Sequence, residues 1–212
     1  MDLPDAEDVP IKDAATLILV RDPETAPKIL LGRRQRNAVF LPNRFVFPGG
    51  AVEPEDANVD LAGELQALCL SRLQDGHQPA TAYPAAAIRE LWEETGLAYG
   101  APGTFDAPAD WISFAAKGLR PKGTGLVYFM RAVTPPGRPR RFDARFFLAN
   151  ATHLFGDIDD FSGRSGELSE LAWVPVGALQ KLLFAPITTY VLDQLIPQLP
   201  DLGAPKELIR LD

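Results

Sequence analysis

The chain has 212 residues, of which 46% are hydrophobic and 23% charged, and this composition predicts an ordinary globular protein with a full hydrophobic core. Its net charge of −7 argues against a surface that coats nucleic acid, since neutralising phosphates needs clustered lysine and arginine. The single cysteine, Cys69, excludes an intramolecular disulfide and a multi-cysteine zinc site. Residues 1–13 are acidic and no stretch reaches membrane-spanning length, so we expect a cytoplasmic protein without a membrane segment.

The first elements in chain order are short apolar strands. Residues 14–20 and 28–31 are β-rich runs separated by turn-forming residues, which predicts a hairpin or meander at the start of the domain. Residues 45–47 predict a further strand. The Pro-Gly-Gly tripeptide that ends at Gly50 follows this strand directly and predicts a sharp backbone turn where side chains would be in the way.

Residues 57–83 read as an insertion in a loop. Leu61, Leu65 and Leu68 stand at helical spacing within it, which predicts an amphipathic helix. Cys69 falls in the same stretch and is expected to be a small core residue of that helix.

The second half of the chain alternates strands with helices. Apolar strand-like runs occur at residues 125–133, 142–150 and 171–176, and helical segments are expected at 177–184 and 186–196. Because hairpin-like pairs occur beside strand–helix alternation, we expect a mixed sheet with helices packed on it.

The decapeptide IRELWEETGL, residues 88–97, concentrates negative charge on a predicted helix of about three turns. Glu90, Glu93 and Glu94 share one helical face, where like charges repel each other. A divalent cation such as Mg²⁺ or Mn²⁺ would relieve this repulsion, because hard ions prefer oxygen ligands. Arg89 stands four residues before Glu93 and can pair with it. The alternative is an acidic surface helix with no bound ion.

Residues 89–97 match, position for position, the second half of the Nudix hydrolase signature, Arg-Glu-aliphatic-x-Glu-Glu-x-Gly-aliphatic. The segment GGAVEPED resembles the first half, with Gly50 as the glycine and Asp56 in the place of the glutamate. Here 32 residues separate Asp56 from Arg89, where most of the family has seven, so an insertion interrupts the motif. The flanking sequence is similar to a subgroup that carries such an insertion and includes coenzyme A diphosphatases.

This resemblance implies a fold and a reaction. The fold is a Nudix α/β/α sandwich with a mixed β-sheet, expected as a single domain over residues 11–198 with the helical insertion at 57–83 inside it. The reaction is the Mg²⁺- or Mn²⁺-dependent hydrolysis of a diphosphate linkage in a nucleoside diphosphate derivative, with coenzyme A or acyl-CoA as leading substrates. A catalytically weak module of the same fold that binds a nucleotide ligand is the alternative.

By the same resemblance, the metal ligands are Glu90, Glu93, Glu94 and Asp56, with Glu93 and Glu94 the strongest candidates. The catalytic set further includes Arg89 and a general base on a distant loop. The candidates for this base, by their order along the chain, are Glu167 and Glu170.

Substrate contacts are expected around the glycine loop. Gly49 and Gly50 would let the backbone approach the helix and the substrate closely, and Arg33 and Arg34 suit phosphate oxygens. Ordinary surface pairing with acids is the alternative for each arginine. Three later arginines form a second candidate phosphate cluster: Arg140, Arg141 and Arg145. The segment 186–196 could pack against its own sheet or against a second copy in a homodimer.

Overall fold

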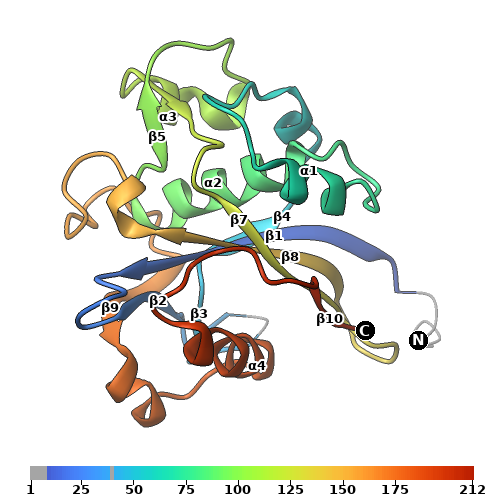
Figure 1. Ribbon diagram of the computed structural model, residues 1–212, viewed down its shortest axis with the longest axis vertical. Helices are drawn as coiled ribbons and strands as arrows, with labels where there is room; N and C mark the ends of the chain where they lie inside the picture. Colours follow the sequence, from blue (N-terminus) through green and yellow to red (C-terminus); the bar gives the residue numbers. More distant parts are fainter. Residues whose placement is uncertain (1–8, 39–40) are drawn as a thin grey trace.

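The computed structural model describes residues 9–38 and 41–212. A mixed sheet crosses the middle of the molecule, with α2, α1 and α3 on one side and α4 on the other (Figure 1). Its strand order is β10-β7-β8-β1-β2-β3, with β4 beside β1 and β9 beside β2. The bounds of its strands are β1 Ile11–Arg21, β2 Lys28–Arg34, β3 Phe45–Val46, β4 Gly49–Ala51, β7 Val127–Val133, β8 Arg141–Asn150, β9 Leu168–Pro175 and β10 Ile209–Leu211.

The remaining elements cover this sheet or connect its strands. The helices are α1 Ala67–Leu73, α2 Ala82–Thr95, α3 Ile112–Ala115 and α4 Pro186–Leu195. Two short strands, β5 Gly100–Pro102 and β6 Leu119–Pro121, pair with each other in a second sheet. The 3₁₀ helices are η1 Pro54–Asn58, η2 Ala109–Trp111, η3 Ala151–His153, η4 Val176–Lys181 and η5 Ile196–Gln198.

The sheet contains both parallel and antiparallel pairs, which confirms the predicted mixed α/β class. β1 runs parallel to β8, and β10 runs parallel to β7. β1 pairs with β2 in the predicted antiparallel hairpin, in which Val20 lies opposite Ile29. Nearer its start, β1 pairs with β4, so that Ala15 lies opposite Gly50. The glycine segment is thereby held as a strand alongside β1, underneath α2.

Strand β1 is buried on both faces. Leu17 and Leu19 point into the hydrophobic cluster on the α2 side, while Ile18 and Val20 point into the cluster on the α4 side. Successive side chains of a strand alternate between the two faces of a sheet, so a continuous apolar run requires cover on both. The sequence of β1 therefore explains the three-layer arrangement.

The predicted helix of the insertion is shorter than expected, and its buried residues are different ones. α1 begins only at Ala67, so Leu61 and Leu65 precede it, and Leu68 is 45% exposed. Cys69 and Leu73 are the buried residues of α1. The prediction for Cys69 is confirmed, since its sulfur lies against the backbone of β7 and accepts a hydrogen bond from the Tyr128 amide.

Two further expectations are corrected. The glycines at 49 and 50 belong to β4 and have no positive φ, so the Pro-Gly-Gly segment is an extended strand rather than a sharp turn. The segment expected as a helix at 177–184 forms the 3₁₀ helix η4. The expected domain range of 11–198 stays a prediction; after it, strand β10 pairs with β7 in the main sheet. In the part of the chain that the structure describes, no helix is long and apolar enough to cross a membrane.

Candidate active site

Helix α2 carries the acidic residues and has the expected boundaries. Pro84 lies in its first turn, where a missing amide hydrogen costs little. Gly96 ends it with a φ of 77°, and the Gly96 amide donates to the Trp92 carbonyl at 2.8 Å. Ile88, Leu91 and Thr95 are fully buried and attach the helix to the sheet. These three positions form a buried stripe on the side of the helix that faces the core.

Arg89, the first residue of the second half of the motif, is buried and donates hydrogen bonds through all three of its side-chain nitrogens. Arg89 is 4% exposed, and its Nε and Nη2 atoms donate to the two carboxylate oxygens of Asp56, each at 2.9 Å. Nη1 donates to Glu90 at 2.9 Å and to Glu93 at 3.3 Å, while Nη2 also donates to the Ala51 carbonyl. The predicted pairing with Glu93 is confirmed. With its donors used in this way, Arg89 holds the neighbouring groups in position.

Asp56 accepts hydrogen bonds from this arginine, an arrangement that favours a positioning role for Asp56 over the expected role as a metal ligand. Besides Arg89, its oxygens accept hydrogen bonds from the Trp111 indole at 3.2 Å and from the Glu53 amide at 2.9 Å. A carboxylate offers about four lone-pair positions, and here four donors occupy them. The side chain is also completely buried. Through its contacts with Arg89, Asp56 therefore joins the first half of the motif to the second half, although the insertion separates them in sequence.

Glu90 and Glu94 face the glycine strand β4. Glu94 accepts a hydrogen bond from the Gly49 amide at 3.0 Å. The carboxylate of Glu90 lies where a side chain at Gly50 would begin, since an added Cβ there would overlap its atoms. The expectation that these glycines let the backbone approach the helix is confirmed; their contact with a substrate stays a prediction.

Replacing Gly50 with alanine is expected to displace the Glu90 carboxylate and to reduce metal-dependent activity about tenfold, because misplacing a group around a metal site typically costs this much. The matched control is Gly177→Ala, where an added Cβ meets no atom within 4 Å. Initial rates at saturating Mg²⁺ check the prediction. Equal rates in the two variants would contradict it.

Burial raises the pKa values of these acids. The largest effect on Glu90 is desolvation, which raises its pKa to about 7 against the lowering effect of Arg89. Desolvation raises the pKa of Glu94 well above its ordinary value, and the nearby Glu90 raises it further. The pKa of Glu93 is raised by the same cause. The surrounding protein therefore does not offset the cost of burying these carboxylates in their charged form.

The three glutamates do not form a closed metal cluster. Across residues 9–38 and 41–212, no group of three or more His, Cys, Asp and Glu side chains lies close enough to hold a metal ion. Glu93 is turned toward Arg89, and its side chain is 37% exposed. Glu90, Glu93 and Glu94 therefore do not all point to one position where an ion could bind. The donor set nevertheless fits a hard cation. Glu90 and Glu94 are desolvated carboxylates, the charge of Glu90 raises the pKa of Glu94, and a side chain at Gly50 would overlap Glu90.

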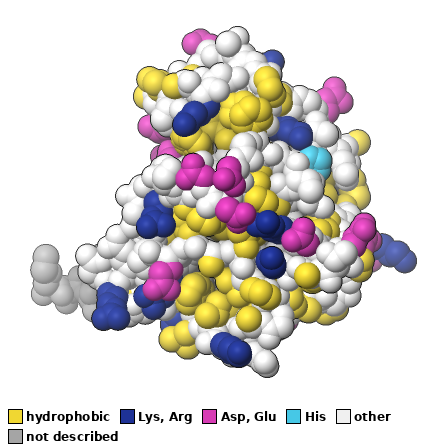
Figure 2. All heavy atoms as spheres, turned by 90° about the vertical axis from the view of Figure 1, so that its left-hand side faces the viewer, with side chains coloured by type: hydrophobic (Ala, Val, Ile, Leu, Met, Phe, Trp, Pro, Cys, Tyr) yellow, Lys and Arg dark blue, Asp and Glu magenta, His cyan; other side chains and the backbone are white. Residues whose placement is uncertain are grey.

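The predicted base candidates differ in their surroundings. Glu167 is exposed in the loop before β9 and raises the pKa values of both Glu90 and Glu94, which indicates that its charge lies near them. Glu170 forms an ion pair with Arg33. Arg34 lowers the pKa of Glu94 and so also lies near the acidic helix. Both base candidates lie on the side of β2 and β9, where acidic and basic side chains form a band between hydrophobic areas (Figures 1 and 2).

The three arginines of the second cluster differ in their surroundings, and Arg145 is engaged by carboxylates. Arg145 is completely buried and pairs with Asp13 and Asp143, while Arg140 is exposed. Arg141 donates to the Thr134 carbonyl. Sequence reasoning also missed Trp111, which holds Asp56. No spacing signal could have identified Trp111, because 55 residues separate it from its partner.

Comparisons with known proteins agree with this geometry. No protein-family model matches the chain. The crystal structure of a NUDIX hydrolase from Alicyclobacillus acidocaldarius is 30% identical in sequence, with a TM-score of 0.67 over 90% of this chain and 93% of that one. The chain belongs to the Nudix hydrolase family. Its predicted Nudix α/β/α sandwich is thereby confirmed.

Two further relatives delimit what this membership shows. The chain is 27% identical over 176 residues to nudix hydrolase 7 of Caenorhabditis elegans, a match that covers 77% of this chain and 51% of that protein. The chain thus spans about half the length of this curated relative. A MutT protein from Methanosarcina mazei, 15% identical with a TM-score of 0.51 over 90% of this chain and 96% of that one, shares the Nudix fold.

Proposed function

We propose that this Nudix protein hydrolyses a diphosphate linkage in a nucleoside diphosphate derivative, in a reaction that requires Mg²⁺ or Mn²⁺. The observation that carries the proposal is the pair of desolvated carboxylates, Glu90 and Glu94, held against the glycine strand with raised pKa values. A cation would compensate their charge, and a diphosphate is the kind of anionic group that such an ion would attract.

Glu90, Glu93 and Glu94 would hold the ion. When bound, the ion supplies charge neutralisation for the diphosphate and lowers the pKa of a coordinated water. Arg89 orients Glu90 and Glu93 through its Nη1 atom, and the Gly49 amide orients Glu94. Glu90 and Glu93 thus share one support, and Glu94 has another. To join the other two at an ion, Glu93 would have to turn from its partly exposed position.

We infer that Glu167 is the general base. A general base must come within hydrogen-bond reach of the attacking water. Glu167 is exposed and acts electrostatically on Glu90 and Glu94, which supports a position beside the diphosphate. Glu170 would first have to leave Arg33. The charge of Arg34 near Glu94 supports a role in holding a phosphate oxygen, and Arg33 would join it on release from Glu170.

For the substrate, coenzyme A and its acyl esters come first, through the similarity of the interrupted motif to the insertion-bearing subgroup. ADP-ribose comes next. The NUDIX domain of Shewanella oneidensis NrtR has been crystallised with ADP ribose, but at 10% identity and a TM-score of 0.50 the likeness concerns the fold alone. The second candidate function, a binding module with weak catalysis, is favoured by the incomplete cluster of glutamates.

A hydrolysis assay with a substrate panel tests the proposal. Purified protein is incubated with coenzyme A, acetyl-CoA, ADP-ribose, NADH and a dinucleoside polyphosphate, each with Mg²⁺, with Mn²⁺ or with EDTA. Wild type is compared with the double variant Glu93→Gln, Glu94→Gln and with Glu64→Gln, an exposed glutamate of the insertion that serves as the control. We expect metal-dependent cleavage in wild type and control only.

The outcomes separate the hypotheses. Cleavage of ADP-ribose but not of coenzyme A would contradict the proposed order of substrates. It would still support the hydrolysis of a diphosphate linkage. Equal background rates in wild type and double variant, with tight nucleotide binding by calorimetry, would support the binding module instead.

A further inference from the structure

The insertion ends on the first turn of the acidic helix. Its last loop, residues 74–81, passes over Tyr83, and the Gln78 amide donates to the Tyr83 hydroxyl at 3.2 Å. Gly76 lies so close to this ring that an added Cβ would stand 2.6 Å from the Tyr83 Cζ atom. The insertion thus begins after Asp56 and ends against the first turn of α2, which precedes Arg89 in the sequence.

Tyr83 is fixed from its other side by the sheet. Its hydroxyl donates to Asp13 of β1 at 3.2 Å, and the same carboxylate oxygen accepts from Arg145 at 2.8 Å. The Arg145 guanidinium lies over the Tyr83 ring, with 4.0 Å between its Cζ atom and the ring centroid. The Nε and Nη2 atoms of Arg145 are buried and make no hydrogen bond to the described residues. The ring face therefore adds to the compensation that Asp13 and Asp143 give this buried cation.

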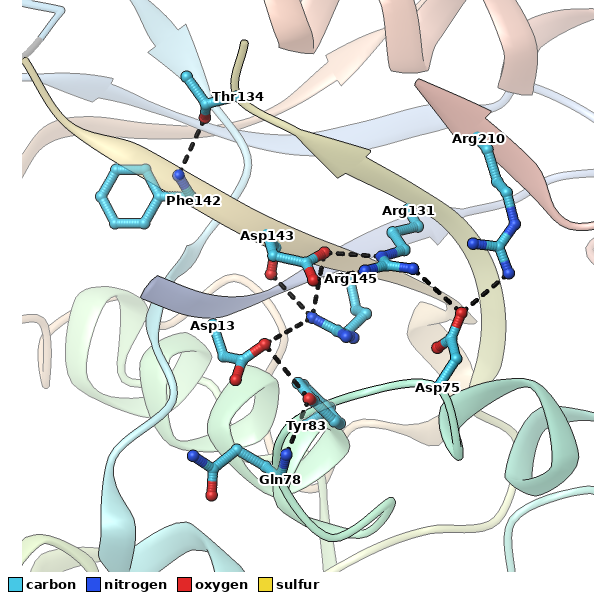
Figure 3. A network of polar contacts seen from close by, with 10 residues as sticks. All are labelled: Asp13, Asp75, Gln78, Tyr83, Arg131, Thr134, Phe142, Asp143, Arg145 and Arg210. Carbon is cyan, nitrogen blue, oxygen red and sulfur yellow. Dashed lines mark hydrogen bonds and ion pairs between the residues drawn. The ribbon is translucent and has the colours of Figure 1, made fainter. Parts of the chain in front are cut away.

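A chain of ion pairs extends this contact to the insertion and the last strand (Figure 3). Arg131 of β7 binds both oxygens of Asp143, at 2.8 and 2.7 Å, and Asp143 pairs with Arg145 at 3.2 Å. Arg131 also contacts Asp75 of the insertion loop, at 3.0 Å, and Asp75 contacts Arg210 of β10, at 2.9 Å. Each cation of this network meets a carboxylate, so the insertion loop is held at Asp75 as well as at Tyr83.

The position of Tyr83 on α2 connects this network to the site. Tyr83, Glu90 and Glu94 stand at i, i+7 and i+11, which places them along one side of the helix. The helix meets the sheet through all three: Tyr83 at Asp13, Glu90 at Gly50 and Glu94 at the Gly49 amide. Tyr83 lies about 10 Å along the axis from Glu90, at 1.5 Å per residue. Contacts on one side of the helix, at separate points along its length, oppose its rotation about its own axis.

We propose that Tyr83 is a positioning residue for the metal-binding glutamates, and that the insertion inside the motif serves to hold Tyr83 in place through Gly76, Gln78 and Asp75. The role of the metal rests on the function proposed above; the holding of the helix does not. The insertion thereby stabilises the geometry of the motif that it interrupts in sequence.

The test compares two tyrosines that each lose one hydroxyl. Tyr83→Phe keeps the ring under Arg145 and loses the bonds to Asp13 and Gln78. Tyr99→Phe, the matched control, loses a buried hydroxyl that donates to the Thr124 carbonyl at 2.9 Å and lies outside α2. Mn²⁺ binding is measured by electron paramagnetic resonance on the protein without substrate. We expect Mn²⁺ to bind about tenfold more weakly to Tyr83→Phe, the usual loss when a residue that orients metal ligands is removed, and unchanged affinity for Tyr99→Phe.

Amide hydrogen exchange of residues 86–95, in the absence of metal, provides an independent measurement. Faster exchange in Tyr83→Phe and in Gly76→Ala, but not in Tyr99→Phe, is the expected result. Equal Mn²⁺ affinities and equal exchange in the two tyrosine variants would overturn the proposal. Should the wild type bind no Mn²⁺, the proposed function fails, and the exchange comparison alone then decides whether Tyr83 holds the helix.

Discussion

Replacing Glu90 with glutamine is expected to remove metal-dependent hydrolysis and at the same time to stabilise the metal-free protein at neutral pH. The activity loss should be on the order of 10²–10³-fold, the typical effect of deleting one group that stabilises transition-state charge. Glutamine keeps the shape of the side chain and still accepts from Arg89, so the change removes charge with little change of packing.

The stability effect follows from the direction of the pKa shift. Burial raises the pKa of Glu90 from 4.5 to about 7 in the folded protein. As pH rises above 4.5, the unfolded chain ionises first, so the metal-free protein loses stability until pH passes about 7. A shift of this size corresponds to about 3 kcal/mol. Below pH 4.5 the group is protonated in both states and the cost disappears.

Urea unfolding in EDTA at pH 4.5 and pH 8 measures this effect. Wild type should lose stability between the two pH values by more than Glu90→Gln does, and the exposed control Glu64→Gln should behave like wild type. Added Mg²⁺ should restore the stability of wild type at pH 8, because a ligand that binds only the folded state stabilises it. Parallel pH profiles for wild type and Glu90→Gln would show that the carboxylate is not desolvated as described.

Replacing Asp56 with asparagine is expected to cost about 3–5 kcal/mol of unfolding free energy, the usual effect of removing one partner of a buried ion pair. Asp56 is completely buried and accepts two bonds from the equally buried Arg89. Asparagine would present an NH₂ group to donors on one side and would remove the completely buried negative charge that faces Arg89. Asp60, whose side chain is 79% exposed in its pair with Arg120, is the matched control. Asp60→Asn should change stability by less than about 1 kcal/mol.

The same variant distinguishes the two roles considered for Asp56. A positioning role predicts that Asp56→Asn is destabilised even in EDTA. A role as metal ligand predicts that the metal-free variant unfolds like wild type and differs only when Mg²⁺ is added. Chemical denaturation with and without the ion measures both.

Local rules were sufficient for much of the fold and for the acidic helix. The spacing of Glu90, Glu93 and Glu94 predicted the acidic face of the helix that α2 forms, because helix periodicity depends on neighbouring residues. The apolar runs of β1 and β8 predicted strands for the same reason. The insertion was less predictable, since Leu61, Leu65 and Leu68 follow a helical period while packing places Cys69 and Leu73 inward.

By itself, then, the sequence determined which family this chain resembles, where its main strands and acidic helix lie, and which acids could meet a cation. Only the tertiary structure decided that Asp56 belongs to Arg89, that Arg145 is buried over Tyr83 rather than offered to phosphate, and that the glutamates stop short of a closed cluster. The reason is physical. Each of these outcomes depends on burial and on which distant groups the sheet register brings within hydrogen-bond distance, and neither quantity is carried by the spacing of residues along the chain.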